Sequence, residues 1–442
     1  MPDSQLVQLA KTVLAHATDI DTYLESNNLP PLSFDLKGPG KFGTIPVPPD
    51  LEKARYAALE AGTELVELLR GPTGFFKPTY NGASLQAVSR WDIPNKVPIN
   101  GEISYTDLSK KCSGIPELAI RSLLRHAIAH YRLFVEPRAG FVAHSPYSRM
   151  LVDEPLLADL LWVTGDIGYS THPHLVDALT KWKDLEPNHC ACSHQAGKEI
   201  PRFDLLRQDP AVAERFSRAM KAFGVFPRGP FTVIQEDGDS SSRSAPTLKY
   251  PWEKLGDALV ADVGGSTGHL SIQIARAFPN PNLRFVVQDL PETVAPAEKN
   301  LPADLADRIR FMPYSFLTPQ TCEADVYMLN NALHNWPEHY VVQILRNQVP
   351  ALRPGARLII TDGLALPHDG PGSGRSLLAE RATRSNDLLM LTIFNAGERS
   401  KEDFARILAE ADSKFRITSI QHLWDPTVNT MPTGIIEVIF DA

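Results

Sequence analysis

The second half of the chain alternates between short β-rich runs and segments of helical length. The β-rich runs of this alternating part are Leu259–Val263, Leu283–Val287, Ile309–Met312, Asp325–Leu329 and Arg357–Thr361. Helix-length stretches such as Leu270–Phe278 and Glu338–Val349 separate them. Because parallel strands need long crossover connections, this alternation predicts βαβ units and a parallel sheet. The last two runs, Phe415–Ile420 and Gly434–Phe440, leave no room for a helix between them and are expected to pair antiparallel. We therefore predict an α/β fold with a mostly parallel, seven-stranded, Rossmann-like sheet.

The first half of the chain is predicted to be mainly helical. Its helical segments, each with apolar residues at three- and four-residue steps, are Leu6–Leu24, Leu51–Leu69 and Ile115–Phe134. Two segments rich in Pro, Gly or Ser, Asn27–Asp50 and Gln235–Thr247, lack such a pattern, and we interpret them as connectors. The chain has 442 residues, enough for more than one domain. We predict a helical domain over residues 1–235 and an α/β domain over residues 236–442.

The charge pattern argues against an anionic partner. The formal net charge is −8, and the sequence has no stretch rich in Lys and Arg. Binding to the phosphates of nucleic acid or to anionic lipid requires such a stretch, so we expect neither partner. The residues Met1–Gln5 lack the basic region of a secretory signal, and no apolar run approaches the ~20 residues that span a bilayer. The sequence therefore predicts a cytoplasmic protein.

The chain contains four cysteines, too few for a stabilising disulfide framework at this length. Two of them, Cys190 and Cys192, lie between His189 and His194. The Cys-x-Cys spacing is tighter than that of a zinc knuckle, and no second ligand pair follows at the expected distance. We therefore interpret these cysteines as an inert surface or loop pair, with a metal site as the less favoured alternative.

A glycine-rich turn follows the first β-rich run. Residues 262–269 read DVGGSTGH and lead into a helical segment. Glycines at such a turn permit a tight bend and a close approach of a ligand, and the helix N-terminus offers unpaired amides. The next run ends in Asp289, where a carboxylate is placed to accept hydrogen bonds from ribose hydroxyls. A plain tight turn is the alternative, but the turn and the acid together predict an adenosine-type ligand.

The turn favours S-adenosylmethionine over NAD. The dinucleotide fingerprint, G-x-G-x-x-G, makes room for a pyrophosphate. The glycines here are Gly264, Gly265 and Gly268, which do not match that register. A cofactor with an amino-acid carboxylate in place of the pyrophosphate places weaker demands on the turn.

His334 is the candidate general base. It lies just past the run Asp325–Leu329, in the segment LHNW. Parallel sheets bind ligands beyond the carboxyl ends of their strands, so this is the edge where the cofactor is expected. A phenolic hydroxyl with a pKa of about 10 is a poor nucleophile until a base removes its proton, and imidazole is the natural base at neutral pH. For an arbitrary histidine, a packing or helix-capping role is the commoner one.

Four segments carry a family resemblance. They are Val260–Leu290 (VADVGGSTGHLSIQIARAFPNPNLRFVVQDL), Asn331–Asp362 (which contains ALHNWPEHYVVQILRNQVPALRPGARLIITD), Asn386–Leu408 (NDLLMLTIFNAGERSKEDFARIL) and Arg125–Leu151 (RHAIAHYRLFVEPRAGFVAHSPYSRML). Together they resemble the class I, S-adenosylmethionine-dependent O-methyltransferases of the plant caffeate type and their fungal secondary-metabolism relatives. The resemblance extends over nearly the whole chain. It implies a helical N-terminal part with a winged-helix subdomain, which forms an intertwined homodimer and helps to close the substrate pocket.

The resemblance also implies roles for individual residues. His334 matches the general base, and Asp362 and Glu398 match two acids around its imidazole, where a carboxylate fixes the tautomer and stabilises the imidazolium. Asp362 is often Glu in the plant enzymes, so Glu398 is expected to be the closer partner. The implied cofactor contacts are Gly264, Gly265, Gly268, Asp289, Leu290, Ser315 and Phe316. The implied substrate contacts are Asn331, Met390 and Phe394, and the chemistry requires no metal.

Two positions depart from the family pattern. Ser315 stands where relatives carry an acid that contacts the adenine amine, and a hydroxyl accepts less strongly than a carboxylate. Asn330, followed by Asn331, stands where a Lys or Arg is common. These departures keep open a chemistry in which the bound cofactor retains its methyl group.

Three functions remain in contention from the sequence. The leading hypothesis is O-methylation of a small aromatic or polyketide-type hydroxyl, with proximity and deprotonation supplying the rate. The alternative is dehydration or pericyclic ring formation, as in some fungal relatives, with the sulfonium acting as a fixed positive charge. A non-catalytic binding partner is least favoured, because the glycine turn, Asp289 and His334 are all present.

Overall fold

The computed structural model divides into two compact units. The described residues are 3–34, 45–76, 82–225, 231–233, 246–365, 376–423 and 433–441. One unit comprises Met1–Pro173 and Phe203–Arg243, and the other comprises His174–Arg202 and Ser244–Ala442. The segment His174–Arg202 thus groups with the C-terminal unit, although the predicted division between 235 and 236 assigns it to the N-terminal domain.

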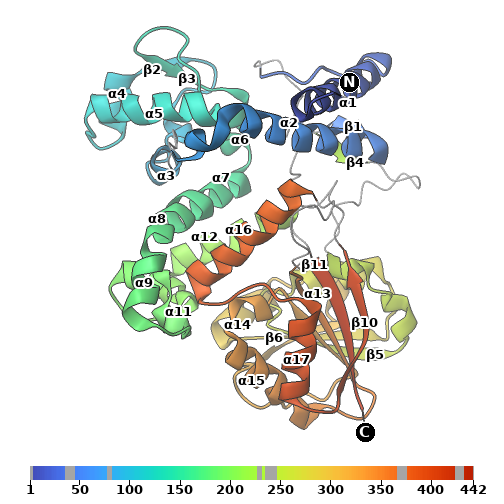
Figure 1. Ribbon diagram of the computed structural model, residues 1–442. Helices are drawn as coiled ribbons and strands as arrows, with labels where there is room; N and C mark the ends of the chain where they lie inside the picture. The colour runs from blue at the N-terminus through green and yellow to red at the C-terminus, as the bar shows by residue number, and fades with distance from the viewer. Residues whose placement is uncertain are drawn as a thin grey trace. The chain divides into compact units, whose positions relative to one another are not determined.

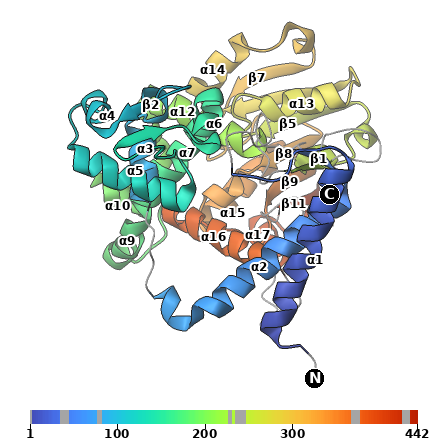
Figure 2. The same cartoon turned by 90° about the horizontal axis from the view of Figure 1, so that it is seen from above.

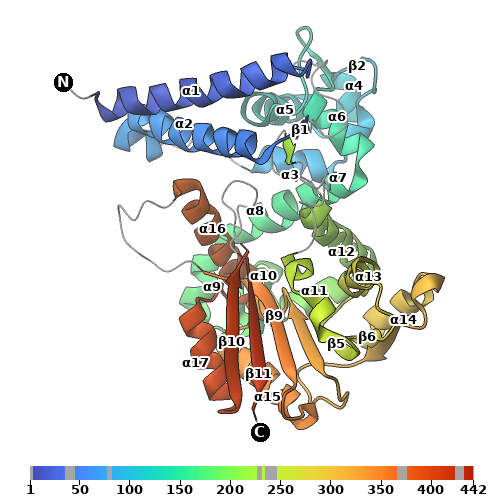
Figure 3. The ribbon, with the colours of Figure 1, turned by 90° about the vertical axis from the view of Figure 1, so that its right-hand side faces the viewer.

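The second unit contains a seven-stranded sheet with the strand order β10-β11-β9-β8-β5-β6-β7 (Figures 1 and 3). Its strands are β5 (Ala258–Val263), β6 (Leu283–Asp289), β7 (Ile309–Pro313), β8 (Val326–Asn330), β9 (Arg357–Gly363), β10 (Phe415–His422) and β11 (Thr433–Phe440). Strands β5 to β9 pair in parallel, whereas β11 pairs antiparallel with both β9 and β10. The predicted fold class and the antiparallel terminal pair are confirmed.

Helices cover both faces of this sheet, which is why its central strands are apolar on both sides. The helices of this unit are α9 (Leu175–Trp182), α10 (Ala191–Ala196), α13 (His269–Ala277), α14 (Pro291–Lys299), α15 (Glu338–Gln348), α16 (Leu377–Phe394) and α17 (Lys401–Ala411). On one face Ala261 and Ile360 lie in a core with α15 and α17 residues such as Phe404. On the other face Val260 and Ile359 lie in a second core that includes α13 residues. The alternation of neighbouring residues between two buried faces follows from the two-residue period of a strand.

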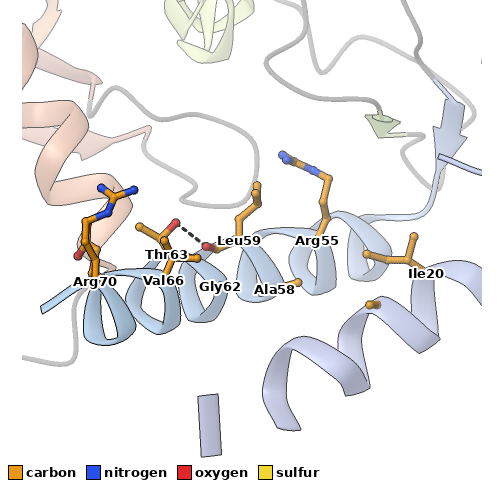
Figure 4. Close-up of a pocket in the computed structure, with 10 residues that line it drawn as sticks. Ile20, Arg55, Ala58, Leu59, Gly62, Thr63, Val66 and Arg70 are labelled. Carbon is orange, nitrogen blue, oxygen red and sulfur yellow. Dashed lines mark hydrogen bonds between the residues drawn. The ribbon is translucent and has the colours of Figure 1, made fainter. Parts of the chain in front are cut away.

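The first unit begins with a pair of long helices that lie side by side (Figures 2 and 3). They are α1 (Gln5–Ser26) and α2 (Pro49–Phe75), and α2 has a kink at Gly71, whose φ is 66° and which precedes Pro72. Figure 4 shows a groove on this pair. The groove is lined by Ala17, Ile20, Arg55, Ala58, Leu59, Gly62, Thr63, Val66, Glu67 and Arg70. Several apolar side chains of the pair are exposed, among them Leu14 and Leu69 at 68% each.

The connector predicted over Asn27–Asp50 is partly wrong. Residues Ile45–Val47 form the short strand β1, which pairs in parallel with β4 (Phe231–Val233). The two paired segments lie far apart in the chain, so no local sequence pattern indicates the pairing. The connector predicted over Gln235–Thr247 lies mostly outside the described residues.

The remainder of the first unit is also mainly helical. Its helices are α3 (Ala83–Arg90), α4 (Tyr105–Lys111), α5 (Glu117–Tyr131), α6 (Pro146–Asp153), α7 (Pro155–Trp162), α8 (Tyr169–Thr171), α11 (Arg202–Arg207) and α12 (Pro210–Val225). Strands β2 (Glu102–Ser104) and β3 (Phe141–Ala143) pair antiparallel and share a hydrophobic core with α4 and α5. The winged-helix subdomain stays a prediction. Within the described ranges, every helix falls short of the length and apolarity that a membrane crossing demands.

Candidate active site

The glycine turn joins β5 to α13 at the carboxyl edge of the sheet. The N–H groups of Gly264 and Gly265 both donate to the carbonyl of Gln288 on β6, at 2.8 and 3.0 Å. Gly264 has a φ of 76°, which disfavours any larger residue, and a Cβ there would lie 3.3 Å from the ring of Phe316. A Cβ at Gly265 would lie 2.5 Å from the side-chain carbon Cγ of Asp262. The side chains of Phe316 and Asp262 therefore occupy the space beside the two glycines, and both positions need glycine.

Asp262 lies beneath the turn, with 2% of its surface exposed. Burial raises the pKa of its carboxyl group to about 7, although the Ser271 hydroxyl, which donates to Oδ2 at 2.6 Å, opposes the rise. Gly268, with a φ of 73°, caps the N-terminus of α13. Asp262 and Ser271 thus tie β5 to the helix that the turn introduces.

Asp289 ends β6 and braces the turn. Its Oδ2 accepts from the N–H of Ser266 at 2.8 Å, and its Oδ1 accepts from the N–H of Leu290 at 2.7 Å. Burial raises the pKa of this carboxyl group. Each carboxylate oxygen can accept a second hydrogen bond, so the predicted contact with ribose hydroxyls is compatible with these two.

Ser315 and Phe316 follow β7 at the same edge. The carbonyl of Ser315 accepts from the N–H of Thr318 at 2.9 Å, which closes a turn. The Phe316 ring lies next to Gly264 and meets Trp336 edge-on, with 5.6 Å between ring centroids. The structure therefore brings the predicted cofactor positions after β5, β6 and β7 to one edge.

His334 lies in a short 3-10 turn, Leu333–Asn335, just past β8. Asn331 precedes it with a φ of 48°, is exposed, and donates its N–H to the carbonyl of Thr361 at 2.7 Å. The N–H of His334 donates to Oδ2 of Asp362 at 3.0 Å. The turn is thus fixed to the end of β9 by two hydrogen bonds.

Arg399 is a site residue that the sequence reasoning missed. Its buried guanidinium donates to the carbonyls of Leu333 and Trp336, at 3.0 and 2.6 Å, on either side of His334. The only sequence signal is its place directly after Glu398. No sequence pattern distinguishes an arginine that donates hydrogen bonds to backbone carbonyls from an arginine on the surface.

The imidazole of His334 faces two buried carboxylates. Its Nδ1 lies 3.1 Å from Oε1 of Glu398 and 3.4 Å from Oδ1 of Asp362. The three side chains are 16%, 4% and 2% exposed, respectively. Burial alone would lower the pKa of His334, but the charge of Asp362 and the hydrogen bond and charge of Glu398 outweigh it and raise the pKa to about 9. The expectation that Glu398 is the closer partner agrees with these distances, and Asp362 nevertheless reaches the ring.

This trio is also the group that can accommodate a metal ion within the described parts of the chain. One ligand atom from each of His334, Asp362 and Glu398 lies within 4.8 Å of the others. The same distances also fit an imidazole that donates the proton on Nδ1 to a carboxylate. The opposite ring nitrogen, Nε2, is then free to act as a base.

The predicted substrate contacts Met390 and Phe394 lie on α16 and are buried, at 8% and 7% exposure. Helix α16 packs against the turn that carries His334 and also against α10. These two predicted substrate contacts therefore come from a helix adjacent to the candidate base. The groove in Figure 4 contains none of these residues.

The interpretation of Cys190 and Cys192 as a surface or loop pair is wrong. Both thiols are buried, at 0% and 2% exposure, at the start of α10. Hydrogen bonding from Cys192 lowers the pKa of Cys190 to about 6. His189 instead approaches Asp184, with 2.8 Å between Nδ1 and Oδ1, and His194 approaches another histidine. Each of the two histidines thus has a partner other than the cysteines.

Comparison with known proteins adds an independent finding. A family model described as an O-methyltransferase domain matches residues 253–414. A grayanic acid biosynthesis cluster O-methyltransferase of Cladonia grayi is 37% identical over 99% of this chain and 88% of that protein. The O-methyltransferase pyvH of Aspergillus violaceofuscus is 36% identical over 100% of both chains.

Solved structures share the fold at lower identity. A crystal structure of OxaC matches with a TM-score of 0.72 and 21% identity over 99% of this chain and 100% of that chain. A structure of LepI in complex with SAM matches with a TM-score of 0.68 and 21% identity, over 98% of this chain and 100% of that chain. A structure described as a pericyclic reaction enzyme matches with a TM-score of 0.69 and 21% identity, over 98% and 100% of the two chains. At these identities the likeness establishes the fold and leaves the reaction open.

Proposed function

The chain belongs to the O-methyltransferase family of secondary metabolism, and we propose that it transfers the methyl group of S-adenosylmethionine to a hydroxyl of a small aromatic or polyketide-type molecule. The observation that carries the proposal is the imidazole of His334, held against Glu398 and Asp362 at the carboxyl edge of the sheet. His334 acts as the general base, Asp362 and Glu398 hold its ring, and Arg399 holds its turn.

The residues at this edge fit the cofactor. Gly264, Gly265 and Gly268 allow the tight turn at the carboxyl end of β5, and Asp289 retains acceptor capacity for ribose hydroxyls. Leu290, Ser315 and Phe316 complete the proposed cofactor contacts. When the cofactor is bound, its sulfonium supplies an electrophilic methyl group. The residues of this chain bind both reactants and remove the proton of the acceptor hydroxyl.

The raised pKa of His334 suits a phenolic acceptor. Proton transfer from a phenol of pKa about 10 to an ordinary imidazole is uphill by about 5 kcal/mol, because each pKa unit corresponds to about 1.4 kcal/mol. With the pKa of His334 at about 9, the same transfer is uphill by about 1.4 kcal/mol. In the free protein at pH 7 only about 1% of His334 is neutral. The fraction that can act as a base therefore grows about tenfold per pH unit until the pH approaches 9.

We extend the proposal to the acceptor site and the assembly. Asn331, Met390 and Phe394 contact the acceptor, and the two buried apolar side chains suit an aromatic ring. The protein is a cytoplasmic homodimer, and the exposed apolar side chains of α1 and α2 support a contact with a second copy. Light scattering during size-exclusion chromatography tests the dimer, and a monomer at micromolar concentration would contradict it.

A second candidate function rests on Asn330 and Ser315. Asn330 replaces a cation in the family pattern and accepts from the hydroxyl of Thr247 at 2.6 Å. In this alternative, cofactor binding supplies only a fixed positive charge for a dehydration or pericyclic cyclisation. The retained pair of His334 and Glu398 favours methyl transfer.

The experiment that tests the proposal uses S-adenosylmethionine with a labelled methyl group and a panel of hydroxylated aromatic compounds. We expect labelled product from the wild-type protein and loss of that product in His334→Ala. Unlabelled product that forms only when the cofactor is present would establish the alternative. Isothermal titration with the cofactor separates both from a non-catalytic partner, for which no heat of binding is expected.

A further inference from the structure

Glu398 is held by two consecutive residues of α16. The amide Nδ2 of Asn386 donates a short hydrogen bond to Oε1 of Glu398, the same oxygen that lies 3.1 Å from Nδ1 of His334. The neighbouring Asp387 accepts from the backbone N–H of Glu398 at 2.9 Å. One α16 residue thus holds the carboxylate and the next holds the main chain.

The other carboxylate oxygen, Oε2, has no such partner. It is buried, and no hydrogen bond reaches it from any described residue. It packs against Gly363 at the end of β9, where an added Cβ would lie 1.7 Å from it. The direction of the Glu398 carboxylate therefore depends on the partners of Oε1.

We propose that Asn386 is a positioning residue that holds the carboxylate of Glu398 directed at His334. Asn386 is half-buried on α16, and its amide donates a hydrogen bond to Glu398. A carboxylate or the lone pair of an imidazole could not take its place, because both only accept hydrogen bonds. Without this hydrogen bond, the carboxylate of Glu398 can turn away from the ring, and the imidazolium of His334 loses part of its counter-charge. The proposal deepens the assignment of His334 as general base and rests on that function.

The test compares Asn386→Leu, which removes the donor at similar size, with Asn386→Gln, which retains an amide. Arg384→Ala is the matched control, because Arg384 is exposed on the same helix and pairs with Glu380 at 2.8 Å, away from Glu398. The first readout is an NMR titration of the His334 ring in the cofactor-free protein, assigned by its disappearance in His334→Gln. The second is the pH profile of methyl transfer, together with KM for S-adenosylmethionine.

We expect Asn386→Leu to lower the pKa of His334 by about one unit, which corresponds to about a tenfold weaker hold on the proton. On the plateau of the pH profile, above both pKa values, we also expect about a tenfold lower kcat with an unchanged KM for the cofactor, and Asn386→Gln to lie closer to wild type. A His334 titration that is the same in Asn386→Leu as in Arg384→Ala would overturn the proposal. The ring titration needs no substrate, so it decides the role of Asn386 even if no acceptor is methylated. Absence of methyl transfer in the wild type would count against the proposed function alone.

Discussion

Replacement of Glu398 by Gln removes one of the two charges that face His334 and keeps the size of the side chain. The interval between the ordinary histidine pKa of 6.5 and about 9 corresponds to about 3 kcal/mol. Because the two carboxylates also offset the lowering of the pKa by burial, this is the least that they supply together. Asp362 remains in the variant at 3.4 Å, so we expect about half of this interval or more to be lost. The predicted result is a pKa of His334 lower by at least about one unit and, at pH values above both pKa values, a kcat lower by about tenfold or more.

The assay is the rate of methyl transfer between pH 6 and pH 10 for the wild type and Glu398→Gln. The wild-type kcat/KM is expected to rise with pH and to level off near 9, and the variant should level off at lower pH and at a lower rate. Glu402→Gln is the control, because Glu402 is 64% exposed on α17 and its nearest ion pair is with Lys401. An unchanged pH profile in Glu398→Gln would show that Glu398 does not raise the pKa of His334, even if the rate were reduced.

The same substitution has a stability counterpart with a defined sign. Folding raises the pKa of His334 above its ordinary value, so the interaction of its imidazolium with Glu398 stabilises the folded state fully below pH 6.5. That contribution is lost as the pH rises through about 9. We expect the difference in unfolding free energy between wild type and Glu398→Gln, measured by urea denaturation, to be larger at pH 6 than at pH 10. A difference that grows with pH would contradict this account.

Three further predictions follow from the same geometry. Gly363→Ala places a Cβ against Oε2 of Glu398, so we expect at least a tenfold loss of kcat with unchanged cofactor affinity; full activity would show that Glu398 tolerates displacement. Gly265→Ala places a Cβ 2.5 Å from Cγ of Asp262, so isothermal titration should show at least tenfold weaker binding of S-adenosylmethionine, and an unchanged Kd would remove the turn from the cofactor site. Dialysis against a chelator should leave methyl transfer unchanged, whereas loss of activity restored by a divalent cation would reassign the trio around His334 to metal binding.

The sheet could be predicted because each strand carries its own signal. The central strands β5, β8 and β9 contribute to the cores on both faces, so short β-rich runs appear in the sequence, and the helices between the strands set the parallel order. The glycines mark the turn after β5, where Gly264 has a φ of 76°. The family resemblance supplied the partners of His334, since Glu398 lies 64 residues further along the chain.

The parts that could not be predicted depend on contacts between distant segments. Pairing of Ile45–Val47 with Phe231–Val233 converts an apparent connector into a strand. Burial of Cys190 depends on the packing of α10 against α16, which leaves no periodic signature in six residues. The hydrogen bonds from Arg399 to two carbonyls could not be predicted either, because a side chain that donates to the backbone leaves no pattern in the sequence.

A crystal structure with S-adenosylhomocysteine and a methylated product bound would show directly whether His334 is the general base. We predict that Nε2 of His334 lies within about 2.6–3.2 Å of the methylated oxygen, that Nδ1 stays against Glu398, and that the nucleoside lies along Gly264–Gly268 with its ribose at Asp289. An imidazole that points away from the product oxygen, or a nucleoside bound elsewhere, would contradict it.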